Sequence, residues 1–223
     1  MSITPCPSTG GWRHTTMRTS MLIISIVVGL LLSSAGSQAG ACDDLSGFKR
    51  LMAGPPRSRY EYRGRYVNWA YEYSVRIPKG LTGYDGRDQA RHSGFALALD
   101  KESQSVVFVS GDPNSVEYNT PREAATRDVE FLRQQGKKIE SETITESRLG
   151  TLDAVLLVVN YACPGSADRY VESSVIALSP DKRFLYTLEL YSPANRYEGS
   201  RAVFDEIIKS WKLISGSRRQ RQR

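Results

Sequence analysis

Apolar and polar positions alternate with the period of a β-strand along much of this 223-residue chain. The alternation is clearest over residues 71–78, where a half-buried strand would place its apolar side chains on one face: Tyr71, Tyr73, Val75 and Ile77. Extended structure is also expected over 94–100, 106–109, 139–149, 152–162, 170–178 and 184–191. Residues 154–159 are apolar on both faces, which predicts a central strand covered on both sides.

Two segments carry helical signals instead. The sequence Thr120-Pro121-Arg122-Glu123 is a capping box with proline at the first helical position, and it predicts a helix that runs to about Gln135. Near the C-terminus, apolar residues recur at helical spacing and form one stripe, which must cover a sheet face: Val203, Phe204, Ile207, Ile208 and Trp211.

The expected strands are joined by short connections. Residues 179–183 have the composition of a tight turn, which makes a hairpin of 170–178 and 184–191. Residues 79–93 are expected to be a polar loop, and most other connections are too short for parallel crossovers. These features predict one α+β domain over 70–214, with a largely antiparallel sheet of about seven strands flanked by two main helices.

Residues 1–41 have the pattern of a secretory signal peptide. Arg13 and Arg18 precede an apolar run over 21–32, and small residues follow as far as Ala41. The run is too short to span a bilayer as a helix, which takes about 20 residues. The mature chain is therefore expected to be exported, periplasmic or secreted, with no transmembrane span after cleavage.

Export also changes how the cysteines are interpreted. Cys6 lies in the removed leader, so Cys42 and Cys163 remain, and in an oxidising compartment they most simply form one disulfide. An alternative is a lipid on Cys42, because residues 39–42 look like a bacterial lipoprotein box. Ala39 stands where leucine is usual in such a box, and the apolar run ends far upstream, so the disulfide is favoured.

The formal net charge of +6 arises at the two ends of the chain. Two basic residues leave with the signal peptide and four lie in the terminal tail, which leaves 24 basic residues against 24 acidic ones. The folded body is formally neutral, so its total charge does not indicate a basic binding face.

Residues 42–69 are expected to form an irregular basic arm, and residues 215–223 a disordered basic tail. In the arm, Tyr60, Tyr62 and Tyr66 interleave with arginines, a pattern that in a cytosolic protein would suit single-stranded nucleic acid. For an exported protein, an anionic envelope surface or polysaccharide is the better match. A solvated arm whose tyrosines pack on the sheet explains the same pattern.

The order of elements resembles that of the PsbP-like family. The resemblance covers roughly residues 71–213, and the features that carry it are a strand ending in Ile77-Pro78, a Thr-Pro-capped helix, long strands around 154–159 and 184–190, and a closing helix with Ile207-Ile208-Lys209-Ser210-Trp211. The family includes the extrinsic photosystem II protein and many exported bacterial proteins. The resemblance implies an antiparallel sheet between helices and a non-catalytic accessory or binding role, and it brings no site residue with it.

Catalytic motifs are scarce. His92 is the only histidine of the expected mature chain, which excludes multi-histidine zinc sites. Asp85, Asp88 and His92 share one loop, where a carboxylate can orient an imidazole as a base or the three can bind a metal weakly. A polar surface loop with local salt bridges also explains them, and it is favoured because no nucleophile motif accompanies the loop. No nucleophile elbow, dinucleotide fingerprint or P-loop occurs, so no cofactor or metal is expected.

Three hypotheses follow from the sequence. The leading one is an exported, non-catalytic binding or accessory protein of the cell envelope, whose partner is an unspecified protein or envelope component. The first alternative is a secreted, hydrolase-like enzyme that uses Asp85, Asp88 and His92. The second is a binder of polyanions or envelope surfaces that acts through the basic arm and tail.

Overall fold

The computed structural model describes residues 52–53, 59–86, 93–102, 104–163 and 167–214. The predicted signal peptide 1–41 and the predicted tail 215–223 lie outside these residues and stay predictions. The domain boundary at residue 70 stays a prediction as well.

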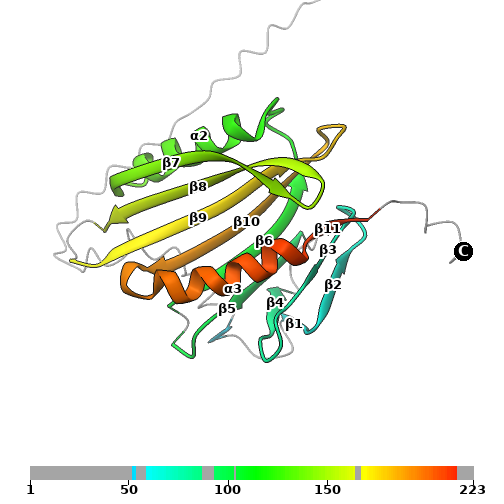
Figure 1. Cartoon of the computed structure of the whole chain (residues 1–223), viewed down its shortest axis with the longest axis horizontal. Helices are drawn as coiled ribbons and strands as arrows, with labels where there is room; N and C mark the ends of the chain where they lie inside the picture. The colour runs from blue at the N-terminus through cyan, green and yellow to red at the C-terminus, as the bar shows by residue number, and fades with distance from the viewer. Residues whose placement is uncertain (1–51, 54–58, 87–92, 103, 164–166, 215–223) are drawn as a thin grey trace, which may run out of the picture. The chain divides into compact units, whose positions relative to one another are not determined.

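The larger of two sheets has eight strands, and every neighbouring pair is antiparallel. Figure 1 shows its long strands side by side. In spatial order the strands are β1 (Arg59–Tyr62), β4 (Gly83–Gly86), β5 (Gly94–Ala98), β6 (Val106–Pro113), β10 (Phe184–Pro193), β9 (Arg169–Leu178), β8 (Leu152–Ala162) and β7 (Lys138–Leu149).

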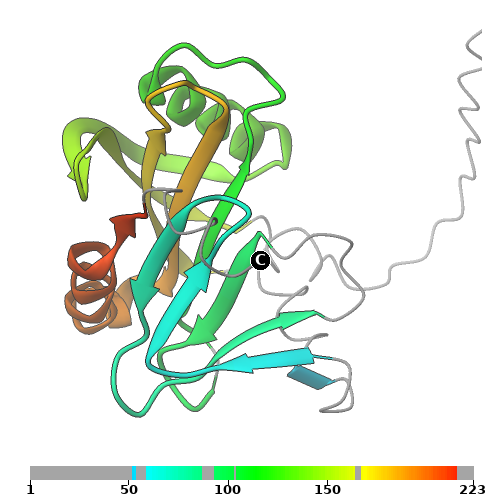
Figure 2. The same ribbon diagram turned by 90° about the vertical axis from the view of Figure 1, so that its right-hand side faces the viewer.

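The smaller sheet has three strands and joins segments that lie far apart in the sequence. Its order is β11 (Lys212–Leu213), β3 (Tyr73–Arg76) and β2 (Arg65–Asn68), again antiparallel. In Figure 2 the cyan strands β2 and β3 lie toward the viewer. The sheet packs on the large one closely, because a Cβ at Gly111 of β6 would lie 2.9 Å from side-chain atoms of Tyr71 and Tyr73.

The two main helices lie on opposite faces of the large sheet (Figure 1). Helix α2 (Pro121–Gln134) begins at the predicted capping box: the Thr120 hydroxyl accepts a hydrogen bond from the Glu123 amide at 3.2 Å. The Glu123 carboxylate accepts one from the Asn119 amide at 2.8 Å. Helix α3 (Tyr197–Ser210) follows the short η3 (Ala194–Arg196).

Each face of the large sheet has its own apolar core. Helix α2 covers one face, where Ala125, Val129 and Leu132 pack with side chains of β8 and β9. Helix α3 and the small sheet cover the other face together, because Phe204 and Ile207 share a cluster with Tyr73 and Val75. The small sheet is therefore held by the same core as the closing helix.

Trp211, the residue after α3, contacts two strands of that second core, β3 and β10. Its side chain is 1 % exposed, and its ring stacks on Tyr73 of β3 with ring centroids 6.1 Å apart and an interplanar angle of 14°. It meets Tyr186 of β10 edge-on at 5.1 Å. The Tyr186 hydroxyl donates to the Tyr71 carbonyl at 2.9 Å, which adds a polar link between the two sheets.

The predicted fold class is confirmed: this is an α+β protein with a largely antiparallel sheet flanked by two main helices. Three local predictions are wrong. The arm 42–69, expected to be irregular, contains β1 and β2, and the expected polar loop 79–93 contains β4. Trp211, expected in the helical stripe, is the residue after α3. The missed strands are only four residues long, and they form because neighbouring strands supply hydrogen-bond partners.

Candidate functional site

The β2–β3 hairpin places two arginines directly opposite each other. Tyr66 and Asn68 of β2 point toward the core, as do Tyr73 and Val75 of β3, so the alternating positions lie on the opposite face of the hairpin. Arg65 and Arg76 occupy such positions, are both exposed, and face each other in the antiparallel register. Like charges at directly opposed positions repel, so this pairing opposes hairpin formation.

A pocket of about 510 Å³ lies beside these two arginines. Two short turns form its walls, and the Ile77 amide joins them by donating to the Gly64 carbonyl at 2.6 Å. Gly64 and Gly80 adopt φ values of +71° and +90° in these turns, a conformation that favours glycine. The lining residues are Arg63, Gly64, Arg65, Arg76, Ile77, Pro78, Lys79, Gly80, Leu81 and Thr82. We call this feature the basic pocket.

Hydrogen bonds orient two of the guanidinium groups without neutralising them. Arg63 Nε donates to Thr82 Oγ1 at 3.1 Å, and Arg65 Nη2 donates to Ser74 Oγ at 3.2 Å. The backbone of Arg76 is held by Ser210 at the end of α3, whose Oγ accepts from the Arg76 amide at 2.9 Å. The remaining guanidinium N–H groups of Arg63 and Arg65 can donate to a ligand.

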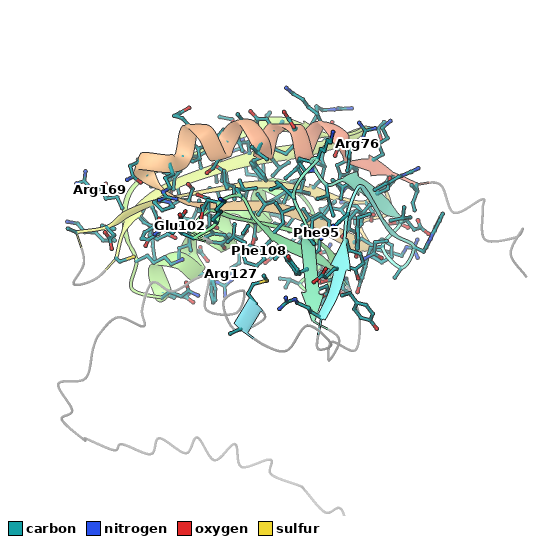
Figure 3. The ribbon with its side chains drawn as sticks, turned by 90° about the horizontal axis from the view of Figure 1, so that it is seen from below. Arg76, Phe95, Glu102, Phe108, Arg127 and Arg169 are labelled. Atoms are coloured by element: carbon teal, nitrogen blue, oxygen red, sulfur yellow. The ribbon has the colours of Figure 1, made fainter. Side chains whose placement is uncertain are left out.

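Within the described part of the chain, no carboxylate forms an ion pair with Arg63, Arg65, Arg76 or Lys79. Every other described arginine has a carboxylate partner. The pairs are Arg59–Glu61, Arg122–Glu146, Arg127–Glu130, Arg133–Glu142, Arg148–Asp153, Arg169–Glu140, Arg183–Asp181, Arg196 with Asp100 and Glu102, and Arg201–Asp205. Figure 3 shows Arg76 at the opposite end of the view from Arg169, one of the paired arginines.

The composition of the basic pocket suits binding and does not suit acid–base chemistry. Its lining residues include no carboxylate, imidazole or thiol. Three guanidinium groups and one ammonium group give it four formal positive charges, while Ile77, Pro78 and Leu81 give it an apolar part. Arginine clusters of this kind bind anions through charge-assisted hydrogen bonds.

The predicted catalytic candidates are only partly described. Asp85 lies in β4 and is 5 % exposed, opposite Tyr60 of β1. Asp88 and His92 lie outside the described residues, so the hydrolase-like alternative stays a prediction. Among the residues that the structure describes, no group of three His, Cys, Asp or Glu side chains is arranged to hold a metal ion.

Two buried tyrosines of the small sheet, Tyr66 and Tyr73, form hydrogen bonds in the core, and Tyr66 lies near Asp85. Asn68 Nδ2 donates to the Tyr66 hydroxyl at 3.2 Å, and the Tyr73 hydroxyl donates to the Ser93 carbonyl at 2.8 Å. Burial raises the pKa of Tyr66 to about 12, and the nearby Asp85 contributes in the same direction. Tyr66 therefore stays protonated at neutral pH and acts as a structural hydrogen-bond partner.

Cys163 follows β8 and is 8 % exposed. Its amide donates to the Asp168 carbonyl at 3.5 Å. Cys42 lies outside the described residues, so both the pairing of Cys42 with Cys163 and the alternative lipid on Cys42 stay predictions. No helix in the described ranges is long and apolar enough to cross a membrane.

The sequence did not predict the basic pocket. Arg63 and Arg65 lie in the expected basic arm 42–69, whereas Arg76 lies in the expected strand 71–78 and Lys79 in the expected polar loop 79–93. The neutral charge of the body gave no sign of a basic face, because total charge does not report how charges are distributed. Positions 65 and 76 alternate with buried positions along their strands, and this alternation is the sequence signal that both side chains lie on the outer face.

No protein-family model matches the chain, and no curated protein matches it either. Solved structures do show similarity. The solution structure of cyanobacterial PsbP (CyanoP) from Synechocystis sp. PCC 6803 has a TM-score of 0.48 at 14 % identity, covering 70 % of this chain and 92 % of that chain. The Ran-binding protein Mog1p of Saccharomyces cerevisiae has a TM-score of 0.48 at 10 % identity, covering 71 % and 98 %.

A third similar structure is LpqN of Mycobacterium tuberculosis, described as involved in cell envelope biogenesis. Its TM-score is 0.35 at 12 % identity, with 73 % of this chain and 87 % of that chain covered. A PsbP is therefore among the structures to which the chain is similar. At these identities and TM-scores the similarity brings no residue role, ligand or partner with it.

Proposed function

We propose that this chain is an exported, non-catalytic binding or accessory protein of the cell envelope, and that it holds an anionic partner in the basic pocket. This proposal joins the leading sequence hypothesis to the polyanion alternative. It moves the binding site from the two chain ends to the small sheet, because Arg63 and Arg65 of the basic arm lie beside Arg76 and Lys79.

One observation carries the proposal. The arginines without a carboxylate partner among the described residues are the three that line the basic pocket. Two of them, Arg65 and Arg76, face each other in register, where their repulsion opposes folding. An anionic ligand would neutralise that repulsion, so the arrangement favours the bound state.

The test is binding of the full mature chain to heparin, a soluble polyanion, over a series of salt concentrations. The variant Arg65→Gln/Arg76→Gln is compared with Arg122→Gln/Arg148→Gln, which removes the same charge from two exposed ion pairs. We expect wild type to bind more weakly as salt rises, the pocket variant to bind at least about tenfold more weakly, and the control variant to bind like wild type.

A third variant separates the pocket from the terminal tail. Replacing Arg218, Arg219, Arg221 and Arg223 by glutamine removes the basic tail from the full chain while leaving the basic pocket unchanged. Binding that followed the tail variant and ignored the pocket variant would contradict the pocket proposal and support the basic ends as the site.

Export and the Cys42–Cys163 bond belong to the same proposal. The bond would close a loop of about 120 residues, which chain-entropy models rate at roughly 4–5 kcal/mol of stability. Its support is the buried position of Cys163 at the end of a long strand and the signal-like leader.

Intact-mass measurement of the exported protein, with and without reduction and thiol alkylation, determines the cleavage site, detects a lipid on Cys42 and tests the bond. Two free thiols would contradict the bond.

A further inference from the structure

We propose that the basic pocket binds a phosphate ester, with Arg65 and Arg76 as the two arms that hold the phosphate group. This inference rests on the proposed function and deepens it, because it names the chemical group that the pocket takes. It concerns soluble phosphate esters and lipid headgroups alike, since both present the same group.

The register of the β2–β3 hairpin sets the spacing of the Arg65 and Arg76 side chains. Side chains at directly opposed positions start from Cβ atoms about 4.5–5.5 Å apart. Arg65 and Arg76 therefore leave the small sheet side by side on its outer face. A phosphate group lying over the strand pair can accept hydrogen bonds from both guanidinium groups, each of which presents a planar fork of donors.

The count of charges favours phosphate over a carboxylate. One bidentate guanidinium is enough to satisfy a carboxylate, and the pocket would then keep three formal positive charges unmatched. A phosphate monoester carries up to two negative charges and three terminal oxygens, so it can engage Arg65, Arg76 and a third donor at once. Arg63 and Lys79 line the same pocket and supply that third donor.

The apolar part of the pocket favours an ester over the free ion. Ile77, Pro78 and Leu81 line the pocket together with the cations. Its volume of about 510 Å³ lies within the range of small-molecule sites and is far larger than one phosphate group needs. The organic part of an ester would contact these side chains.

The experiment is titration calorimetry of the full mature chain with glycerol 3-phosphate, inorganic phosphate and acetate, together with binding to vesicles of phosphatidylcholine with or without phosphatidic acid. We expect glycerol 3-phosphate or the phosphatidic acid vesicles to bind, and acetate to bind at least about tenfold more weakly. Arg65→Gln and Arg76→Gln should each weaken binding about tenfold or more, whereas Arg122→Gln should not change it.

The probes and the variants give distinct outcomes. Binding of either phosphate source with loss in Arg65→Gln and Arg76→Gln supports the inference, and the source that binds identifies whether the ligand is soluble or a lipid headgroup. Equal affinity for acetate, or no binding of any phosphate probe, overturns it. If heparin still binds through the pocket in that case, the proposed function stands and only the phosphate inference fails; if heparin binding is also independent of the pocket, both fail.

Discussion

Two regions of the molecule, the edge of the large sheet at β7 and the small sheet, use arginine in different ways. Around β7, arginines of α2 and β9 reach across to glutamates of that strand, as in Arg122–Glu146, Arg133–Glu142 and Arg169–Glu140. At the small sheet, Arg65 faces Arg76 and no described carboxylate pairs with either. Around β7 the positive charges are neutralised by carboxylates of the protein itself. At the small sheet the two guanidinium charges have no such partner among the described residues.

The difference matters because the pairs around β7 are exposed and contribute little to stability, of the order of 0–1 kcal/mol each. They still show a consistent pattern, because each described arginine outside the basic pocket has a carboxylate partner. The basic pocket departs from that rule at a small cost in stability. Stability given up at one surface is a common feature of binding sites.

The largest expected effect tests whether the small sheet depends on the shared core. Trp211→Ala removes a 1 % exposed side chain that contacts both sheets, so we expect a loss of about 3–5 kcal/mol in the free energy of unfolding. Denaturant unfolding measures it. Phe131→Ala is the matched control, because Phe131 is 56 % exposed on α2, and its loss should stay below about 1 kcal/mol. Equal losses would show that the small sheet does not share the core.

Asp128, a partly buried carboxylate on α2, differs from the paired carboxylates around β7. Burial raises the pKa of Asp128 to about 6, and no described residue forms an ion pair with it. The native state therefore binds this proton more tightly than the unfolded state. Its stabilising contribution is complete below about pH 4 and is lost as pH rises through about 6.

Asp128→Asn should therefore raise stability at pH 7 by about 1–2 kcal/mol and flatten the stability profile between about pH 4 and pH 6. Unfolding midpoints measured across that range provide the check. Glu130→Gln, an exposed position on the same helix, serves as the control and should leave the slope unchanged. A slope that persists in Asp128→Asn would show that another group titrates there.

Ser210 tests how firmly the backbone of the basic pocket is held. Its hydroxyl accepts from the Arg76 amide at 2.9 Å and donates to the Ile207 carbonyl at 2.8 Å. Ser210→Ala removes both bonds, and we expect a loss of about 1 kcal/mol in stability. Ser115→Ala, at an exposed loop position, should change stability by less than about 0.5 kcal/mol. Indistinguishable variants would mean that these bonds do not hold α3 to β3.

The smallest expected effect is a change in stability that has opposite signs for an arginine of the basic pocket and for a paired arginine. Arg76→Thr removes the repulsion with Arg65 and should raise stability by a few tenths of a kcal/mol, roughly 0.2–0.5. Arg148→Thr removes the ion pair with Asp153 and should lower stability by a similar amount. Thermal unfolding of both variants under identical low-salt conditions measures the difference. A loss in both would show that Arg76 also stabilises the fold.

The sequence predicted the long elements and β3 well, and it missed the other strands of the small sheet. Helix α2 begins where the Thr120 capping box placed it, and the hairpin of β9 and β10 turns at the expected residues. Strands β2 and β4 are too short for alternation to reveal, and β11 pairs with β3 across a long sequence separation.

The basic pocket could be predicted only in part for the same reason. Arg63 and Arg65 were visible as charges in a basic segment. That Arg76 faces Arg65 depends on the register of β2 and β3, and the turn between the two strands, which includes Glu72 at φ +58°, sets that register. Carboxylate partners for the remaining arginines come from other elements, so their pairing depends on tertiary structure.

The most direct test of the central claim is the heparin affinity of Arg65→Gln/Arg76→Gln measured beside Arg122→Gln/Arg148→Gln at one salt concentration. Both variants lose the same net charge, and they differ only in whether the lost arginines lie in the basic pocket or in ion pairs. The predicted result is binding at least about tenfold weaker in the pocket variant, with the control close to wild type. Equal affinities in the two variants would contradict the claim that the unpaired arginines form the binding site.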